Sequence, residues 1–139
     1  MPAAQSEPKG PFAPQTQPKP GLDSAMSPKP RFFAPLYHGA NKLLGKAALI
    51  TGADSGIGKS VAVLFAREGA DAAVVYLPAE QSDAEETKEY VEKEGRRCLL
   101  LPGDVKDPAF CRDAVERTVT EFGRLDVLVN NAAEQHVCE

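Results

Sequence analysis

Short, mostly apolar runs alternate with longer helix-like stretches from residue 43 onward. The runs are bounded by glycine or polar residues, and their length and apolar centres indicate strands buried on both faces. They occupy residues 47–50, 72–76, 98–101 and 125–130. The stretches between them, 57–67, 83–94 and 107–122, have helical character, and a glycine follows each within two residues.

Strands that alternate with helices predict an α/β protein with a parallel sheet and right-handed crossovers. The expected strand order is 3-2-1-4. That order is the N-terminal half of a doubly wound (Rossmann) sheet together with the first strand beyond the switch point, where a ligand is expected to bind.

Apolar spacing also predicts which helix faces turn inward. The apolar residues of the first helix fall at i, i+4, i+7 and i+8, and those of the third at every fourth position. The predicted inner faces are Ile57, Val61, Leu64 and Phe65 for the first helix, and Phe110, Ala114, Thr118 and Phe122 for the third.

The first forty residues differ from the rest, because they hold nine of the twelve prolines and show no apolar periodicity. Such a composition is typical of polyproline II or disordered segments. We therefore expect residues 1–42 to be a disordered Pro-rich N-terminal extension and residues 43–139 to be a partial Rossmann domain. A spacer is the favoured role for the extension, and a ligand for a proline-recognising groove is the alternative.

Charge and cysteine content narrow the function classes. The formal charge is −4, with about +3 in residues 1–45 and −7 in the remainder, and an acidic body argues against binding of nucleic acid. Cys98, Cys111 and Cys138 show no C-x-x-C spacing, which favours a reducing compartment. Because no signal-type apolar region or run of about 18 apolar residues is present, we expect a cytoplasmic protein without a membrane segment.

The segment 51–58, Thr-Gly-Ala-Asp-Ser-Gly-Ile-Gly, joins the first strand to the first helix. Gly52 permits the tight exit from the strand, Gly56 lets backbone approach a pyrophosphate, and Gly58 lets helix and strand pack closely. The helix N-terminus offers unpaired N–H groups to phosphates. This context, rather than the glycines alone, indicates a dinucleotide-binding loop.

A P-loop is the rival interpretation of this loop, because Gly58-Lys59-Ser60 matches the end of the motif G-x-x-x-x-G-K-[ST]. That motif needs glycine at position 53, where this chain has Ala53. An NTPase is therefore only a remote alternative, with Lys59 and Ser60 expected to be ordinary first-turn helix residues.

Three motifs occur in order: the glycine loop at 51–58, Gly-Asp-Val at 103–105, and Asn-Asn-Ala-Ala at 130–133. With them the chain resembles the short-chain dehydrogenase/reductase superfamily over residues 40–137. The Pro-rich extension makes it similar to the bacterial general-stress and glucose/ribitol-dehydrogenase-like subgroup. The resemblance implies that the chain is the NAD(P)-binding portion of an oxidoreductase, truncated after the fourth strand. It also implies that the full-length form moves hydride to or from an alcohol or carbonyl substrate and forms homo-oligomers.

The resemblance also implies residue roles. Asp104 would accept a hydrogen bond from the adenine amino group beside Val105, although a turn-forming Asp is the alternative. Asn130 would tie the sheet together, and Ala133 departs from the glycine usual in the family. The residues expected to bind the cofactor are Gly52, Asp54, Ser55, Gly56, Ile57, Gly58, Tyr76, Asp104, Val105, Asn131 and Ala132.

The choice between NAD and NADP depends on the end of the second strand. NAD-dependent relatives place an acid there, and this chain has Tyr76 and Leu77, with Ser55 in the loop position where NADP-dependent relatives carry a base. The expectation leans to NADP. Glu134 and His136 are expected to lie on a loop rim rather than to form a metal or acid–base pair.

The 139 residues contain no Tyr-x-x-x-Lys, because the residues four positions after Tyr37, Tyr76 and Tyr90 are not lysines. Family members use such a Tyr, with a Ser, to exchange a proton with the substrate oxygen. A non-catalytic nucleotide-binding or interaction module is therefore the alternative function for the chain as given.

We predict that the 139-residue chain does not catalyse hydride transfer. An apolar face of the fourth strand is also expected to be left open, which favours aggregation. NADH and NADPH oxidation can be measured with a panel of aldehydes, ketones and sugars, with light scattering to follow the assembly state. Turnover above background by a monodisperse sample would contradict the prediction.

Overall fold

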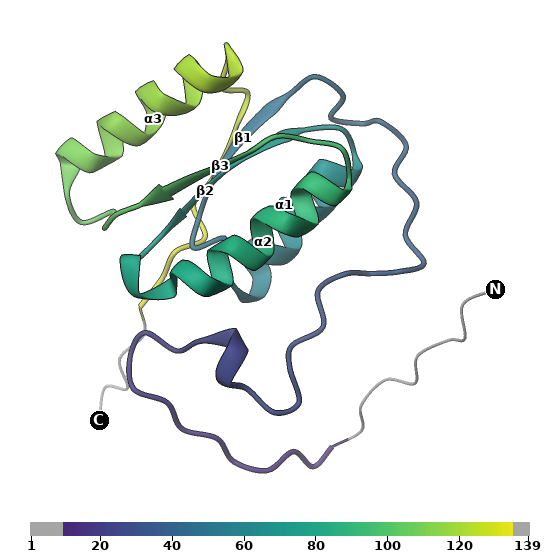
Figure 1. The fold of residues 1–139 in the computed structure, drawn as a ribbon, viewed down its shortest axis with the longest axis vertical. Coiled ribbons are helices and arrows are strands. Elements are labelled where there is room, and N and C mark those ends of the chain that lie inside the picture. Colours follow the sequence, from purple (N-terminus) through teal and green to yellow (C-terminus); the bar gives the residue numbers. More distant parts are fainter. Residues whose placement is uncertain (1–9, 135–139) are drawn as a thin grey trace.

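The computed structural model describes residues 10–134 and shows four parallel strands with helices on both sides (Figure 1). The sheet order is β3-β2-β1-β4, as predicted. The strands are β1 Ala47–Thr51, β2 Asp71–Tyr76, β3 Cys98–Pro102 and β4 Val127–Val129. The helices are α1 Gly56–Arg67, α2 Gln81–Lys93 and α3 Pro108–Phe122, with short 3-10 helices η1 Asp23–Ala25 and η2 Pro78–Glu80.

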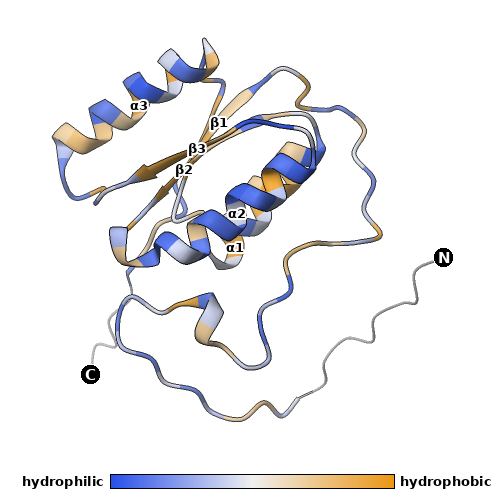
Figure 2. Cartoon of the chain, viewed as in Figure 1, coloured by the Kyte–Doolittle hydropathy of each residue, from blue (hydrophilic) through white to orange (hydrophobic). Residues whose placement is uncertain are grey.

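Two apolar layers enclose the sheet. Helices α1 and α2 cover one face and α3 covers the other (Figure 1), and Figure 2 shows that the strands are among the most hydrophobic segments. Every residue of β1 and β2 is buried, which matches their continuous apolar sequence. On the α3 face, Leu128 pairs in register with the buried Leu49 but stays 54% exposed.

The inner face of α1 differs from the predicted one. Ile57 is 76% exposed, and the fully buried apolar positions are instead Ala62, Val63 and Ala66. Small residues let the helix axis approach the sheet, and the larger Phe65 is only partly buried at the edge of the core. The predicted face of α3 is confirmed at three positions, since Ala114, Thr118 and Phe122 are buried.

Element ends shift by a few residues. Pro102, predicted in a turn, is the last residue of β3 and pairs with Tyr76. Proline is tolerated there because β3 is an edge strand. Strand β4 covers only the central part of the predicted run 125–130.

The described part of the extension contacts the helices of the domain. Phe32 and Phe33 pack against the Tyr90 ring of α2, with ring centroids 4.8 and 5.5 Å away. Arg67 at the end of α1 donates hydrogen bonds to the carbonyl oxygens of Phe33 and Ala34 at 3.0 and 2.9 Å. No periodic pattern signals such contacts, because they use single aromatic rings and backbone groups. The domain boundary at residue 43 stays a prediction.

Glu68 fastens the last part of the extension. Its carboxylate accepts hydrogen bonds from the Tyr37 hydroxyl and from the amides of Ala40 and Lys42, the latter two at 2.9 and 3.0 Å. These donors lower the pKa of Glu68 from 4.5 to about 2, with the Tyr37 hydroxyl as the largest cause. A carboxyl group with a depressed folded-state pKa stabilises the structure above its unfolded pKa and stops doing so as the pH falls through the folded value.

We predict that the contact of residues 37–42 with α1 loosens as the pH falls from 4.5 towards about 2. The amide resonances of Ala40 and Lys42 can be followed through this pH window. In Glu68→Gln the two amide resonances should change little over that pH range. At neutral pH they should already resemble those of the loosened segment. Glu89→Gln, a change of an exposed carboxylate on α2, is the matched control and should behave like the unchanged chain.

Candidate functional site

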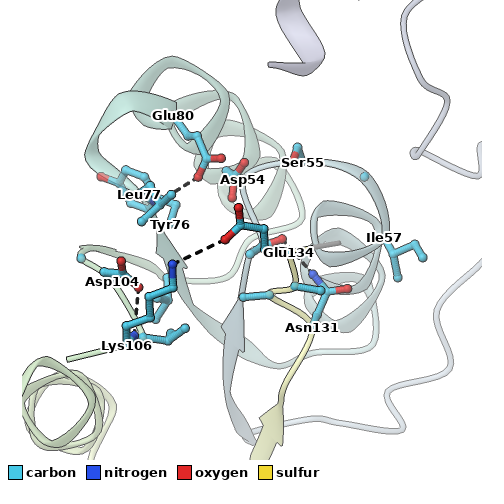
Figure 3. Close-up of a pocket in the computed structure, with 17 residues that line it drawn as sticks. Asp54, Ser55, Ile57, Tyr76, Leu77, Glu80, Asp104, Lys106, Asn131 and Glu134 are labelled. Carbon is cyan, nitrogen blue, oxygen red and sulfur yellow. Dashed lines mark hydrogen bonds and ion pairs between the residues drawn. The ribbon is translucent and has the colours of Figure 1, made fainter. Parts of the chain in front are cut away.

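A cavity of about 440 Å³ opens at the carboxyl ends of the strands, and Figure 3 shows the residues that line it. Its volume falls in the range of small-molecule sites, and its place is the switch point of the sheet. All the predicted cofactor-binding residues except Gly58 line it. The lining residues are Gly52, Asp54, Ser55, Gly56, Ile57, Val75, Tyr76, Leu77, Glu80, Gly103, Asp104, Val105, Lys106, Asn131, Ala132, Ala133 and Glu134.

Each glycine of the loop is required for a different structural reason. Gly52 and Gly56 adopt positive φ angles of 64° and 52°, which side chains disfavour. A Cβ on Gly58 would overlap the Gly52 carbonyl oxygen and lie 2.6 Å from Nδ2 of Asn131. Gly58 therefore serves the close packing of α1 on the end of β1, while a Cβ added to Gly56 would meet no atom within 4 Å.

The loop after β4 is fixed to the end of β1 by Thr51 and Asn131. The Thr51 hydroxyl oxygen accepts hydrogen bonds from the amides of Asn131 and Ala132, both at 3.0 Å. The Asn131 side-chain amide donates to the carbonyl oxygens of Thr51 and Gly52 at 3.1 and 3.0 Å. The tie expected from Asn130 is thus made by Asn131, which corrects the predicted role, and no role was predicted for Thr51.

Asp54 is a buried acid in the wall of the cavity. It is 2% exposed, and its Oδ2 has no hydrogen-bond partner among residues 10–134. Burial raises the pKa of Asp54, and the charges of Asp83 and Asp23 add to the effect. The loop backbone at this point is held to α2, because the Thr87 hydroxyl donates to the Asp54 carbonyl oxygen at 3.1 Å.

The side of the cavity next to β2 carries a carboxylate that the sequence prediction missed. Glu80 in η2 lines the cavity, and it accepts a hydrogen bond from the Leu77 amide at 2.9 Å. Burial raises the pKa of Glu80. The sequence pattern places such an acid at the strand end, where the Tyr76 hydroxyl instead donates to Gln81 at 2.5 Å.

Asp104 follows β3 and Glu134 follows β4, and Lys106 contacts both residues (Figure 3). Oδ1 of Asp104 accepts a hydrogen bond from the Lys106 amide at 2.9 Å, which is the turn-forming role considered as the alternative. The Lys106 ammonium lies 3.5 Å from the Glu134 carboxylate. Glu134 therefore lies on the rim of the cavity, and His136 and Cys138 lie outside the described residues.

Lys59 takes no part in the cavity, which argues against a P-loop. It is 1% exposed, and its ammonium forms an ion pair with Glu86 of α2 at 2.6 Å. The same ammonium lies 4.2 Å from the centre of the Phe32 ring. Within residues 10–134 there is no cluster of three or more potential metal ligands, and no helix is long and apolar enough to cross a membrane.

The sheet order, the glycine loop and the cavity at the switch point define a Rossmann-type α/β protein. The sequence model of the short chain dehydrogenase family matches residues 46–139. The chain belongs to the short chain dehydrogenase family.

Individual relatives extend this assignment. General stress protein 39 of Bacillus subtilis is 58% identical over 123 residues, which are 88% of this chain and 43% of that protein. A short chain dehydrogenase from Burkholderia cenocepacia, solved in complex with NADP, is 41% identical with a TM-score of 0.64 and aligns with 67% of this chain and 38% of its own. One from Mycobacterium paratuberculosis, solved with NAD, is 38% identical with a TM-score of 0.61, and the match covers 66% of this chain and 38% of the other. The chain therefore spans less than half the length of these relatives.

We predict that Asp54→Asn stabilises the protein at neutral pH. A raised pKa means that the folded state favours the protonated acid, so stability is lost as the pH rises above the ordinary value of 3.8. Removing this buried charge, one of whose oxygens lacks a partner among residues 10–134, should raise the free energy of unfolding by about 1 kcal/mol.

Thermal unfolding at several pH values checks this. The gain should shrink as the pH is lowered towards 3.8, where the native side chain is protonated. Asp113→Asn, a change of an exposed carboxylate on α3, is the control for net charge. A loss of stability in Asp54→Asn at neutral pH would contradict the interpretation of Asp54.

Proposed function

We propose that the chain binds a nicotinamide dinucleotide in the cavity at the switch point, as the cofactor-binding portion of an oxidoreductase. The observation that carries the proposal is the convergence of three separate motifs on one cavity. The glycine loop after β1, the Gly103–Val105 turn after β3 and the Asn131–Ala132 segment after β4 line it together.

The residues of the cavity fit the chemistry of such a cofactor. The N-terminus of α1 presents backbone N–H groups towards anions, and the lack of a side chain at Gly56, where an added Cβ would meet no atom within 4 Å, leaves room for a pyrophosphate. Asp54 lies in the wall of the cavity, and the Asp104 carboxylate would accept a hydrogen bond from the adenine amino group. Asn131 and Ala132 would border the ribose and nicotinamide side.

A bound nicotinamide ring would supply the hydride acceptor or donor. The chain's own residues would bind and orient the cofactor, and the Tyr-x-x-x-Lys of the family does not occur among its 139 residues. We therefore propose cofactor binding, rather than turnover of an alcohol or carbonyl substrate, as the function of this segment. Binding without chemistry is also what the non-catalytic alternative would require.

Two observations bear on the choice of dinucleotide. The absence of an acid at Tyr76 and Leu77 favours NADP. Glu80, however, brings a carboxylate to the same side of the cavity, and a 2′-phosphate would meet its charge. The preference proposed from the sequence remains NADP, and titration with both dinucleotides decides it. A reducing compartment such as the cytoplasm suits the free thiols of Cys98 and Cys111.

We predict that Gly56→Val weakens dinucleotide binding by roughly tenfold or more, which corresponds to about 1.4 kcal/mol. The side chain would fill the open space through which the pyrophosphate approaches and would disfavour the positive φ of 52°. Titration calorimetry with NAD and NADP measures the change.

Gly95→Val is the matched control, because Gly95 also has a positive φ, of 77°, and an added Cβ would meet no atom within 4 Å, but Gly95 follows α2. The two variants should lose similar thermal stability, while only Gly56→Val loses affinity. Equal affinity in Gly56→Val and the unchanged chain would remove the loop from the proposed site.

A further inference from the structure

Residues 19–23 of the extension lie at the edge of the dinucleotide cavity. Oδ2 of Asp23 accepts a hydrogen bond from the amide of Gly56, the first residue of α1, at 3.2 Å. The amide of Asp23 donates to Oδ2 of Asp83 on α2 at 2.8 Å. On another side, the Lys19 ammonium lies 3.2 Å from the Glu134 carboxylate, which lines the cavity. The extension thus contacts the cavity wall at both Gly56 and Glu134.

The rest of the extension is fastened at a distance from the cavity. Phe32 contacts both the Lys59 ammonium and the Tyr90 ring, and Arg67 and Glu68 form hydrogen bonds with residues between 33 and 42. These contacts are made with α1 and α2. The chain between Asp23 and Phe32 is therefore tethered at its far end, which keeps the Asp23 carboxylate at a high local concentration near the loop.

A carboxylate at the N-terminus of α1 occupies the position that an anionic ligand would use. The helix terminus carries a partial positive charge that stabilises one nearby anion, and two anions there repel each other. The surroundings are already acidic, because the buried Asp54 and Asp83 lie beside the same loop. A pyrophosphate that binds there must displace the Asp23 carboxylate or bear its repulsion.

We propose that Asp23 is a residue of the cofactor site that sets its affinity, because its carboxylate competes with the pyrophosphate for the N-terminus of α1. This inference rests on the proposed dinucleotide function. It concerns only the phosphate-bearing part of the ligand. The extension then acts as an internal competitor rather than as a passive spacer.

The test compares Asp23→Asn with the unchanged 139-residue chain. Asparagine keeps an oxygen that can accept from the Gly56 amide and removes only the charge. Dissociation constants are measured for NAD, ADP and adenosine. Asp23→Asn should bind NAD and ADP roughly two- to fivefold more tightly, in line with a charge at a helix terminus, and bind adenosine equally well because adenosine has no phosphate.

Two controls sharpen the comparison. Asp113→Asn makes the same change of net charge on the outer side of α3, and it should leave all three constants unchanged. Raising the salt concentration to about 1 M shortens the screening length to about 3 Å and should remove most of the gain in Asp23→Asn. Asp23→Ala, which also removes the hydrogen bond, should bind NAD at least as tightly as Asp23→Asn.

The outcomes separate this inference from the proposed function. If the unchanged chain binds NAD and Asp23→Asn binds it no more tightly, the competition is wrong and the dinucleotide site stands. Equal gains for adenosine and ADP would also overturn the competition, because the phosphate would then be irrelevant. If no variant binds NAD or ADP, the proposed function fails, and the competition fails with it.

Discussion

The side-chain amide of Asn131 holds together the point on which the site depends. At a switch point the loops after β1 and β4 diverge, so the carbonyl groups at the end of β1 lack ladder partners. Asn131 donates to two of them, at Thr51 and Gly52. Gly58 must lack a side chain because a Cβ would enter this junction. This junction fixes the positions of the loops after β1 and β4, and these loops form part of the wall of the cavity.

The part of the glycine loop at Asp54 is also fixed, but this arrangement buries a carboxylate. The Thr87 hydroxyl of α2 donates to the Asp54 carbonyl oxygen, and the Asp54 side chain is buried near other acids with one oxygen that has no partner within the described part of the chain. Buried polar groups without partners are rare, and they concentrate where function requires them. The backbone of the loop is thus held in place, while the buried Asp54 side chain is a local source of instability.

Much of the fold could be predicted because its signals are strong: buried parallel strands have continuous apolar sequences, and right-handed crossovers restrict their order. Large apolar residues misled the prediction for α1, since its inner face uses alanines and Ile57 turns outward to the cavity. Asn130 and Asn131 are adjacent and chemically identical, so only geometry separates their roles. Glu80 comes from a short 3-10 helix, and no periodicity predicts its approach to the cavity.

The contacts of the extension and the occupancy of the cavity are thermodynamically linked. Any ligand that binds more weakly because the extension is in place must, by reciprocity, weaken the hold of the extension by the same factor. The aromatic and charged contacts of the extension at Phe32, Arg67 and Glu68 lie away from the cavity. The contacts of Asp23 and Lys19 lie at the cavity. A dinucleotide could therefore displace residues 19–23 without detaching the rest. The exposed contacts near the cavity are individually weak, so the coupling between ligand and extension is small enough to be reversible.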